Sequence, residues 1–496
     1  MRLGEMLGAL SLATDLAAGT PLETSLRTCL LATRLARALG LPELVEVRRV
    51  ALLRHLGCTA FAHEAAALAG SDHDLLATFA GVDLGSRAAV AGRTLTTLGR
   101  DEPLGKRLGI IARAAVHPGT GSALIGAQCA QAVALAEDLE LPPGVIAALG
   151  QIYERHDGRG EPHHLAGDAI HPAARILHVA ELVEIHHRTF GRDAALAEVQ
   201  RRRGKHLAPE VVDALVAGAN DWWPDLESPS VWDRYLDADD PDDTNLERDR
   251  VARAFGRYVD LKSPFTLGHS AGVAALAAAA SADPRVHTAA LLHDLGMVSV
   301  PNGIWDKPGA LNAAEWERVR LHAYHTQRIL AQTPLLADVA ALAGAHHERL
   351  DATGYHRGAA AAQLDAEARI LAAADAYRAM REHRPHRAAL TADAAADALA
   401  ADARDGKLCR RAVDAVLGAA GRATPDRTLP AGLTPREVEV LIHLARGSTN
   451  KQIASSLGIA VRTANHHVEN IYAKINVTTR AAAALFAVRN ELLQPE

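Results

Sequence analysis

Apolar residues recur along most of this chain at the three- and four-residue spacing of an amphipathic helix. Residues 316–321 alternate apolar and charged side chains in this way, whereas 271–280 and 339–345 are continuous apolar runs that fit buried helices. Aromatic residues make up only 4% of the chain, and alanine is abundant, which favours helices over strands. The pattern predicts an all-α protein.

Two segments interrupt the helical pattern. Residues 219–249 are acidic and carry Trp222, Trp223 and several prolines, and residues 422–431 carry Pro425 and Pro430. Because 496 residues are too many for one core, we interpret both segments as linkers. The predicted domains are 1–218, 250–421 and 432–496.

The first two blocks resemble each other. Ala-Arg-Ile-Leu occurs at 174–177 and 368–371, and Glu-Arg-x-Asp recurs at the same offset, at 154–157 and 348–351. The second block's histidines are mostly absent from the first. In the alignment, His269 lies opposite about Arg27, and His293–Asp294 lies opposite Arg54–His55. His346–His347 lies opposite Ile152–Tyr153, and only His322 is aligned with a histidine, His117. We therefore predict a degenerate first repeat with a regulatory or packing role.

Composition narrows the class of protein. A net charge of -6 means that the chain as a whole does not attract nucleic acid, so any binding of nucleic acid must depend on a local surface. The four cysteines form no CxxC pair, which is typical of reduced thiols. The longest apolar run, 271–280, is half a membrane span, and no GxxxxGK[ST] motif occurs. These observations predict a cytoplasmic protein without a membrane partner or an ATP-driven function.

The second block concentrates residues that bind metal ions. They are five imidazoles and two carboxylates, each in or beside an apolar run: His269, His293, Asp294, His322, His346, His347 and Asp375. Asp375 stands among alanines, where a carboxylate is costly to bury unless a cation lies opposite. A single histidine is more often a surface or core residue, and we assign His287 and His325 to that class. The whole set predicts a two-metal site.

The second block resembles the HD-GYP subgroup of the HD phosphohydrolases, all-helical metal-dependent enzymes that hydrolyse cyclic di-GMP. The resemblance rests on these segments: Thr266-Leu-Gly-His-Ser, Leu291-Leu-His-Asp-Leu-Gly, Val300-Pro-Asn, Lys307-Pro-Gly, His346-His-Glu-Arg-Leu-Asp, Gly354-Tyr and Ala368-Arg-Ile-Leu-Ala-Ala-Ala-Asp. It implies two divalent ions, iron, manganese or zinc. His269, His293, Asp294 and Asp375 would hold one ion, and His322, His346 and His347 the other, with Asp294 as the bridging catalytic residue.

Several positions depart from that family. Met297 replaces a lysine that meets a phosphate, and His356 replaces the proline of the Gly-Tyr-Pro signature. Ala352 stands where a glycine is usual, so we expect the loop backbone to differ in shape. Lys307 and Arg349 are either replacement phosphate contacts or solvated loop charges. Hydrolysis of another phosphoester, and ligand sensing without turnover, both stay open.

The third block has the pattern of a helix-turn-helix domain. Thr434 and Gly447 bound one helix, and Gly458 separates a short helix, 450–457, from a longer amphipathic one, 461–475. A three-helix bundle for protein contact would show the same periodicity.

The third block is similar to the LuxR/FixJ-type DNA-binding domain, a four-helix fold, through Leu433-Thr-Pro-Arg-Glu-x-Glu-Val-Leu, Asn450-Lys-x-Ile-Ala and His467-Val-x-Asn-Ile-Tyr-Ala-Lys-Ile. This similarity implies phosphate contacts from Lys451 and Thr463, and major-groove contacts from three residues: Arg462, Asn465 and His466. Ala460 replaces a common serine cap, and a homodimer seam is expected around Leu485 and Val488.

Together the blocks predict a DNA-binding transcriptional regulator whose metal domain hydrolyses a phosphoester, with a cyclic dinucleotide such as cyclic di-GMP as the candidate substrate. The alternative is a non-catalytic, ligand-sensing metal domain that controls the DNA-binding domain. A phosphohydrolase with a vestigial C-terminal domain is the third interpretation.

Overall fold

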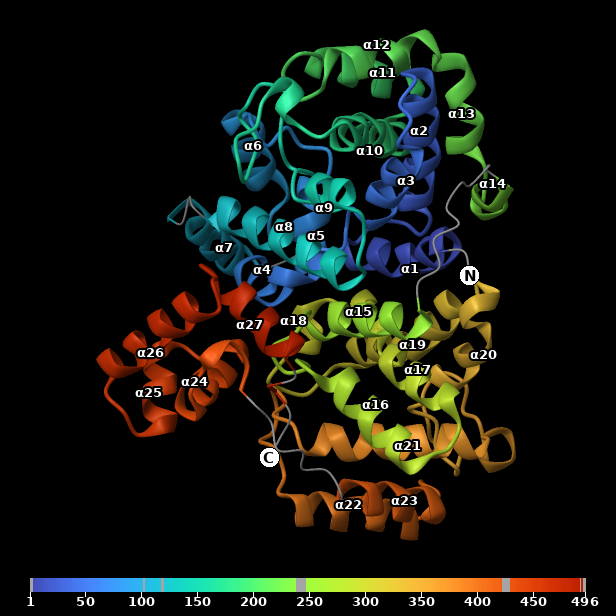
Figure 1. The fold of residues 1–496 in the computed structure, drawn as a ribbon, viewed down its shortest axis with the longest axis vertical. Helices are drawn as coiled ribbons and strands as arrows, with labels where there is room; N and C mark the ends of the chain where they lie inside the picture. Colours follow the sequence, from blue (N-terminus) through green and yellow to red (C-terminus); the bar gives the residue numbers. More distant parts are fainter. Residues whose placement is uncertain are drawn as a thin grey trace. The chain divides into compact units, whose positions relative to one another are not determined.

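The computed structural model describes residues 3–100, 103–116, 120–237, 247–421, 429–490 and 492–493. Every regular element in these ranges is helical, and pairing between extended residues is limited to isolated bridges such as Asp157 with Ala166. The prediction of an all-α protein is confirmed. The chain forms two compact units, Met1–Leu246 and Glu247–Glu496 (Figure 1).

Unit 1 is built around α2, α3 and α10, which pack against one another. Its α-helices are Leu3–Ala17 (α1), Thr24–Ala38 (α2), Leu44–Leu53 (α3), Ala62–Ala69 (α4), Asp72–Phe79 (α5), Arg87–Thr97 (α6), Leu104–Val116 (α7), Thr120–Asp138 (α8), Pro143–Leu149 (α9), Pro172–Phe190 (α10), Arg192–Arg202 (α11), Pro209–Ala217 (α12), Ala219–Glu227 (α13) and Trp232–Asp237 (α14). Short 3₁₀ turns cover Cys58–Phe61 and Gly167–Ala169.

Unit 2 contains the predicted metal domain followed by the helix-turn-helix domain. The first part comprises Arg248–Asp260 (α15), His269–Ala280 (α16), Pro284–Leu292 (α17), Asn302–Trp305 (α18), Ala313–Leu330 (α19), Pro334–Ala343 (α20), Ala366–Met380 (α21), Ala392–Arg404 (α22) and Arg410–Ala420 (α23), with 3₁₀ turns at Leu295–Ser299 and Ala361–Gln363. The second part, which we call the reader, comprises a 3₁₀ turn at Pro430–Gly432 and four helices: Pro435–Ala445 (α24), Asn450–Leu457 (α25), Val461–Lys474 (α26) and Arg480–Arg489 (α27).

The repeat is visible as matching hydrogen bonds. In unit 1 the Asp15 carboxylate accepts bonds from the Ser25 backbone N–H and hydroxyl, and Asp260 accepts the same two bonds from Ser270. Both serines follow their aspartate by ten residues. His269 precedes Ser270 as Thr24 precedes Ser25, so Thr24 is the counterpart of His269. The alignment made from the sequence placed Arg27 opposite His269 and was therefore wrong by three residues. The error arose because a helical sequence pattern repeats nearly every turn.

The segment 219–249, which we expected to be a linker, is folded over much of its length. It contains α13 and α14, and its Trp222, Trp223 and Tyr235 side chains are buried. Burial of three aromatic side chains is enough to hold an acidic, proline-bearing segment in a helical arrangement. Residues 238–246 lie outside the described ranges, as do 422–428 in the second predicted linker and His117.

None of the described helices combines the length and the apolar character that a bilayer crossing requires.

Candidate metal centre and nucleic-acid interface

The seven predicted ligand residues come together in unit 2, although they span more than a hundred residues of sequence. His269 opens α16, His293 and Asp294 directly follow α17, and His322 lies within α19. The pair His346–His347 follows α20, where the chain leaves the helix, and Asp375 lies in α21. A helix end lets two adjacent imidazoles turn toward one site. All but His347 are buried.

The side chains form two sets, and the carboxylate of Asp294 lies between them. One set is Asp294, His322, His346 and His347, and the other is His269, His293 and Asp375; within each set the ligand atoms lie within 4.8 Å of one another. Asp294 Oδ1 is 3.3 Å from His322 Nε2 and 3.4 Å from His346 Nε2. Asp294 Oδ2 is 3.5 Å from His293 Nε2 and 3.7 Å from His269 Nε2. The two oxygens of Asp294 therefore face different imidazole sets, which is the geometry of a bridging ligand.

The imidazoles present lone pairs to the centre. Backbone carbonyls of the preceding turn accept a hydrogen bond from Nδ1 of His293 (Ala290), His322 (Val319) and His346 (Ala343), which leaves each Nε2 unprotonated in the neutral ring. His322 Nε2 and His346 Nε2 are only 3.0 Å apart, and the buried His293 Nε2 has no hydrogen-bond partner. Lone pairs that converge without a donor between them fit a bound cation.

Electrostatics favour a neutral ring at His293 and ionised carboxylates at Asp375 and Asp294. Burial lowers the pKa of His293 to about 4, so this ring is neutral at pH 7. Burial would raise the pKa of Asp375, but the hydrogen bond from His269 and the neighbouring His347 hold it well below its usual range. The pKa of Asp294 is likewise low, because the surrounding imidazoles outweigh its burial. The centre therefore offers two carboxylates together with imidazole nitrogens, a donor set that suits iron, manganese or zinc.

One residue of the centre was missed from the sequence. The Glu382 carboxylate oxygen Oε2 lies 2.9 Å from His269 Nδ1, on the side of the ring that faces away from the cluster. Arg378 and Arg384 hold the carboxylate at 2.6 and 3.0 Å. Burial would lower the pKa of His269, but Glu382 and Asp375 raise it to about 10, so a metal ion must displace a proton there. The available signal was spacing: Glu382 follows Asp375 by seven residues, about two helical turns.

Replacing Glu382 with glutamine is expected to weaken metal binding about 10- to 100-fold, because carboxylate partners of ligating histidines contribute that much to affinity. Titration of metal-stripped protein with Mn²⁺ measures the effect. Glu317→Gln, at an exposed glutamate of α19, is the control and should bind like the wild type. Unchanged affinity in Glu382→Gln would remove Glu382 from the centre.

Aromatic and basic side chains lie around His347. The centroids of the Tyr355 and His347 rings are 4.2 Å apart. Arg320 Nη2 donates a hydrogen bond of 2.9 Å to the Tyr355 carbonyl oxygen. Arg349 lies within electrostatic reach of both His347 and Tyr355. Lys307 instead pairs at 2.7 Å with Glu315, whose carboxylate belongs to the capping box at the start of α19.

Two family departures can be located. Met297 is fully buried in the 3₁₀ turn after Asp294, so its side chain packs in the core. Ala352 has φ = 62°, the left-handed region that favours glycine. The expected change of backbone shape is therefore not seen at this residue: the loop keeps a glycine-type conformation, at a cost of about 1–2 kcal/mol for alanine. Gly354 leaves room for the Glu348 backbone, because a Cβ there would lie 2.6 Å from Glu348 Cα.

Unit 1 has a guanidinium at the matching place. Arg54, the counterpart of His293, is buried and pairs with Glu181, the counterpart of Asp375, at 2.5 Å. A guanidinium thus supplies the positive charge that the carboxylate needs. Among the described residues, clusters with metal-ligand spacing occur only in unit 2.

The reader presents the predicted DNA-contact residues on its surface. Lys451 on α25 and Arg462, Thr463, Asn465 and His466 on α26 are all exposed. Asn450 Nδ2 donates a hydrogen bond of 2.7 Å to Asn465 Oδ1, which connects the two helices across the turn at Gly458. Thr434 and Glu437 form a reciprocal capping box at the start of α24, and Thr449 caps α25.

Helix α26 begins at Ala460 without a side-chain cap. Ala460→Ser is expected to stabilise the reader by about 1 kcal/mol, since the backbone at Ala460 (φ -69°, ψ 148°) already suits a capping serine. The urea midpoint of the reader's unfolding measures the gain. Thr479→Ala, which removes the cap that α27 does have, should lower the midpoint; an unchanged midpoint in Ala460→Ser would contradict the argument.

Comparison with known proteins agrees with this architecture. The HD domain family matches residues 121–211 and 257–408, and the luxR family of bacterial regulatory proteins matches 431–487. The 3'3'-cGAMP-specific phosphodiesterase 3 of Vibrio cholerae is 32% identical over 415 residues, which cover 79% of this chain and 89% of that protein. A crystal structure of a cyclic GMP-AMP-specific phosphodiesterase from that organism superimposes with a TM-score of 0.58 at 25% identity, covering 86% of this chain and all of the other.

Shorter matches cover the two functional parts separately. A cyclic di-GMP phosphodiesterase of Pseudomonas aeruginosa is 38% identical over 135 residues, 25% of this chain and 32% of that protein. The transcriptional regulatory protein LiaR of Bacillus subtilis is 41% identical over 73 residues, 14% of this chain and 35% of that protein.

Proposed function

The chain belongs to the HD-domain family that includes the 3'3'-cGAMP-specific phosphodiesterase of Vibrio cholerae, and it carries a LuxR-type DNA-binding domain; from this we propose that it hydrolyses a cyclic dinucleotide and binds DNA. The reaction consumes one water, breaks one P–O ester bond and leaves a linear dinucleotide that ends in a phosphomonoester. The identity with the cGAMP phosphodiesterase extends over both units, which favours 3'3'-cGAMP as the first substrate to test and cyclic di-GMP as the second.

The position of Asp294 between the two imidazole sets is the observation that carries the proposal. Its Oδ1 faces His322 and His346 while its Oδ2 faces His269 and His293. A pair of divalent ions held this way supplies charge neutralisation and orientation for in-line attack on phosphorus. We assign the first ion to His269, His293 and Asp375, and the second to His322, His346 and His347.

The chain's own residues would bind and orient the phosphate. Burial raises the pKa of Tyr355 to about 12, so its hydroxyl stays protonated and can donate a hydrogen bond beside His347. Arg349 is near enough to both residues to attract a phosphate to this side of the centre. The Trp316 ring, 5.8 Å from that of Tyr355, extends an aromatic surface on which a base can stack.

A second candidate function is ligand sensing without turnover. Met297 favours it, because the buried methionine supplies no ammonium where the HD-GYP pattern has lysine. Loss of one preorganised donor costs about 10²–10³ in rate, so the metal domain could bind a cyclic dinucleotide and hardly cleave it.

Turnover and binding measurements separate the two functions. Purified protein is loaded with Mn²⁺ or Fe²⁺ and assayed on 3'3'-cGAMP, cyclic di-GMP and bis(p-nitrophenyl) phosphate, with product analysis and calorimetry in parallel. Cleavage of a cyclic dinucleotide supports the enzyme. Binding without product supports the sensor, and neither binding nor cleavage would reject both.

The reader's proposed partner is double-stranded DNA, which implies a cytoplasmic protein. The exposed face of α26 supplies the base contacts, and Lys451 and Thr463 the phosphate contacts. Since one small domain makes few phosphate contacts, we propose that a homodimer binds two half-sites.

A further inference from the structure

The segment 261–268 connects α15 with α16 and touches the reader. Leu267 is 9% exposed and belongs to the same apolar cluster as Val488 and Leu493 of the reader, with Leu261 packed against that cluster. A Cβ added at Gly268 would lie 3.5 Å from Leu493 Cβ, and one added at Gly447 would lie 3.6 Å from Pro264 Cβ. The reader's core therefore includes side chains of the metal domain.

The same segment leads directly into the metal centre. Gly268 has φ = 76° and precedes His269, the first residue of α16. The ends of the segment are fastened by Asp260, which accepts bonds from the Ser270 N–H at 3.0 Å and the Ser270 hydroxyl at 2.6 Å. Only one residue separates Leu267, in the reader's cluster, from the imidazole of His269.

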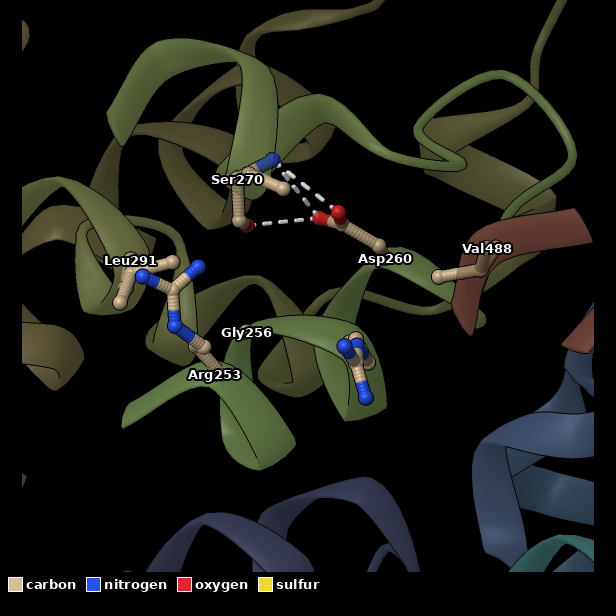
Figure 2. A pocket seen from close by; sticks show the side chains of 8 residues that line it. Arg253, Gly256, Asp260, Ser270, Leu291 and Val488 are labelled. Carbon is tan, nitrogen blue, oxygen red and sulfur yellow. Dashed lines mark hydrogen bonds between the residues drawn. The ribbon is translucent and has the colours of Figure 1, made fainter. Parts of the chain in front are cut away.

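The fastened end of the segment also lines a pocket that the reader helps to form (Figure 2). Val488 of α27 reaches this pocket, whose other walls include Gly256, Asp260, Ser270 and Leu291 (Figure 2). Val488 is a residue of the predicted homodimer seam. A second copy of the chain that packed on Val488 would compete with this contact.

Polar contacts join the metal centre to the segment. Glu382, whose carboxylate contacts His269 Nδ1, pairs with Arg384, and Arg384 Nη1 donates a hydrogen bond of 2.6 Å to the Phe265 carbonyl within the segment. The metal-ligating ring is thus joined to the segment by polar contacts, and the segment to the reader by apolar ones.

We propose that segment 261–268 couples the metal centre to the reader: a cation at His269 holds Leu267 in the reader's core, and loss of the cation releases α27. This rests on the proposed metal binding. By linkage, release of the reader must weaken metal binding by the factor by which metal loss weakens docking. Displacement of α27 would also free Val488 for a second copy of the chain.

Hydrogen–deuterium exchange of the full chain, with and without Mn²⁺, tests the coupling without DNA or substrate. In the wild type, Mn²⁺ is expected to slow exchange around His346 and to slow exchange of the α27 amides by about fivefold or more. In Leu267→Ala, the His346 region should still respond to Mn²⁺, whereas α27 should exchange at the same rate with and without the ion.

Leu457→Ala is the matched control, since Leu457 lies at the end of α25, which packs on α24 and α26. It removes an equal side chain that packs against the reader's core, and it should keep the response of α27. An α27 response that survives Leu267→Ala, or that is absent from a wild type whose His346 region is protected, overturns the coupling and leaves the proposed function intact. Absence of any Mn²⁺ effect overturns both.

Discussion

Replacing Asp294 with alanine should lower kcat/KM for cyclic-dinucleotide hydrolysis by at least about 10³-fold and reduce bound metal at both positions. Removal of a single preorganised electrostatic partner typically costs 10²–10³ in rate, and Asp294 faces both imidazole sets. Its loss also leaves His322 Nε2 and His346 Nε2 facing each other at 3.0 Å without a carboxylate beside them. Elemental analysis and steady-state kinetics on 3'3'-cGAMP measure the two effects.

Two variants make this result interpretable. Asp294→Asn keeps the side-chain shape, so a similar loss there assigns the effect to charge and not to misfolding. Asp338→Ala removes an aspartate that pairs with Arg248 away from the centre, and it should retain both ions and full activity. Full metal content in Asp294→Ala would show that the carboxylate is not a ligand.

Replacing Arg462 with alanine should weaken specific DNA binding about 10- to 100-fold, a loss of about 1–3 kcal/mol for one bidentate base contact. Arg462 is exposed at the start of α26, near the position where a recognition helix enters the major groove. The measurement compares affinity for a selected operator with affinity for unrelated duplex DNA. The variant should lose affinity for the operator and keep its affinity for the unrelated sequence.

Lys451→Ala provides the contrast, because a phosphate contact lowers affinity for all sequences alike. We expect the slope of log Kd against log[salt] to fall by about the contribution of one phosphate contact in this variant. Its preference for the operator sequence should be retained. If Arg462→Ala instead behaved like Lys451→Ala, Arg462 would be a backbone contact. If neither changed binding, α26 would not be the recognition helix, and the bundle for protein contact would be favoured.

Local sequence patterns were sufficient for the helices of the reader and for the seven side chains that gather in the metal domain. The capping box at Thr434, the uncapped start of α26 at Ala460 and the turn at Gly458 each depend on a few neighbouring residues. The histidines and aspartates of unit 2 could be selected together because each lies at a regular place in an apolar run. Neither the register of the repeat at Thr24 nor the folding of 219–237 could be found in this way, since both depend on contacts with distant helices.

By itself, the sequence determined that the chain is helical, that it carries a LuxR-type reader, and which seven side chains gather in the metal domain. Only the tertiary structure decided that the two oxygens of Asp294 face different imidazole sets, that Glu382 supports His269, and that Leu267 lies in the reader's core. Helix periodicity specifies which face of a helix is apolar. The partner of that face is chosen by packing between residues far apart in the chain, and no local pattern encodes it.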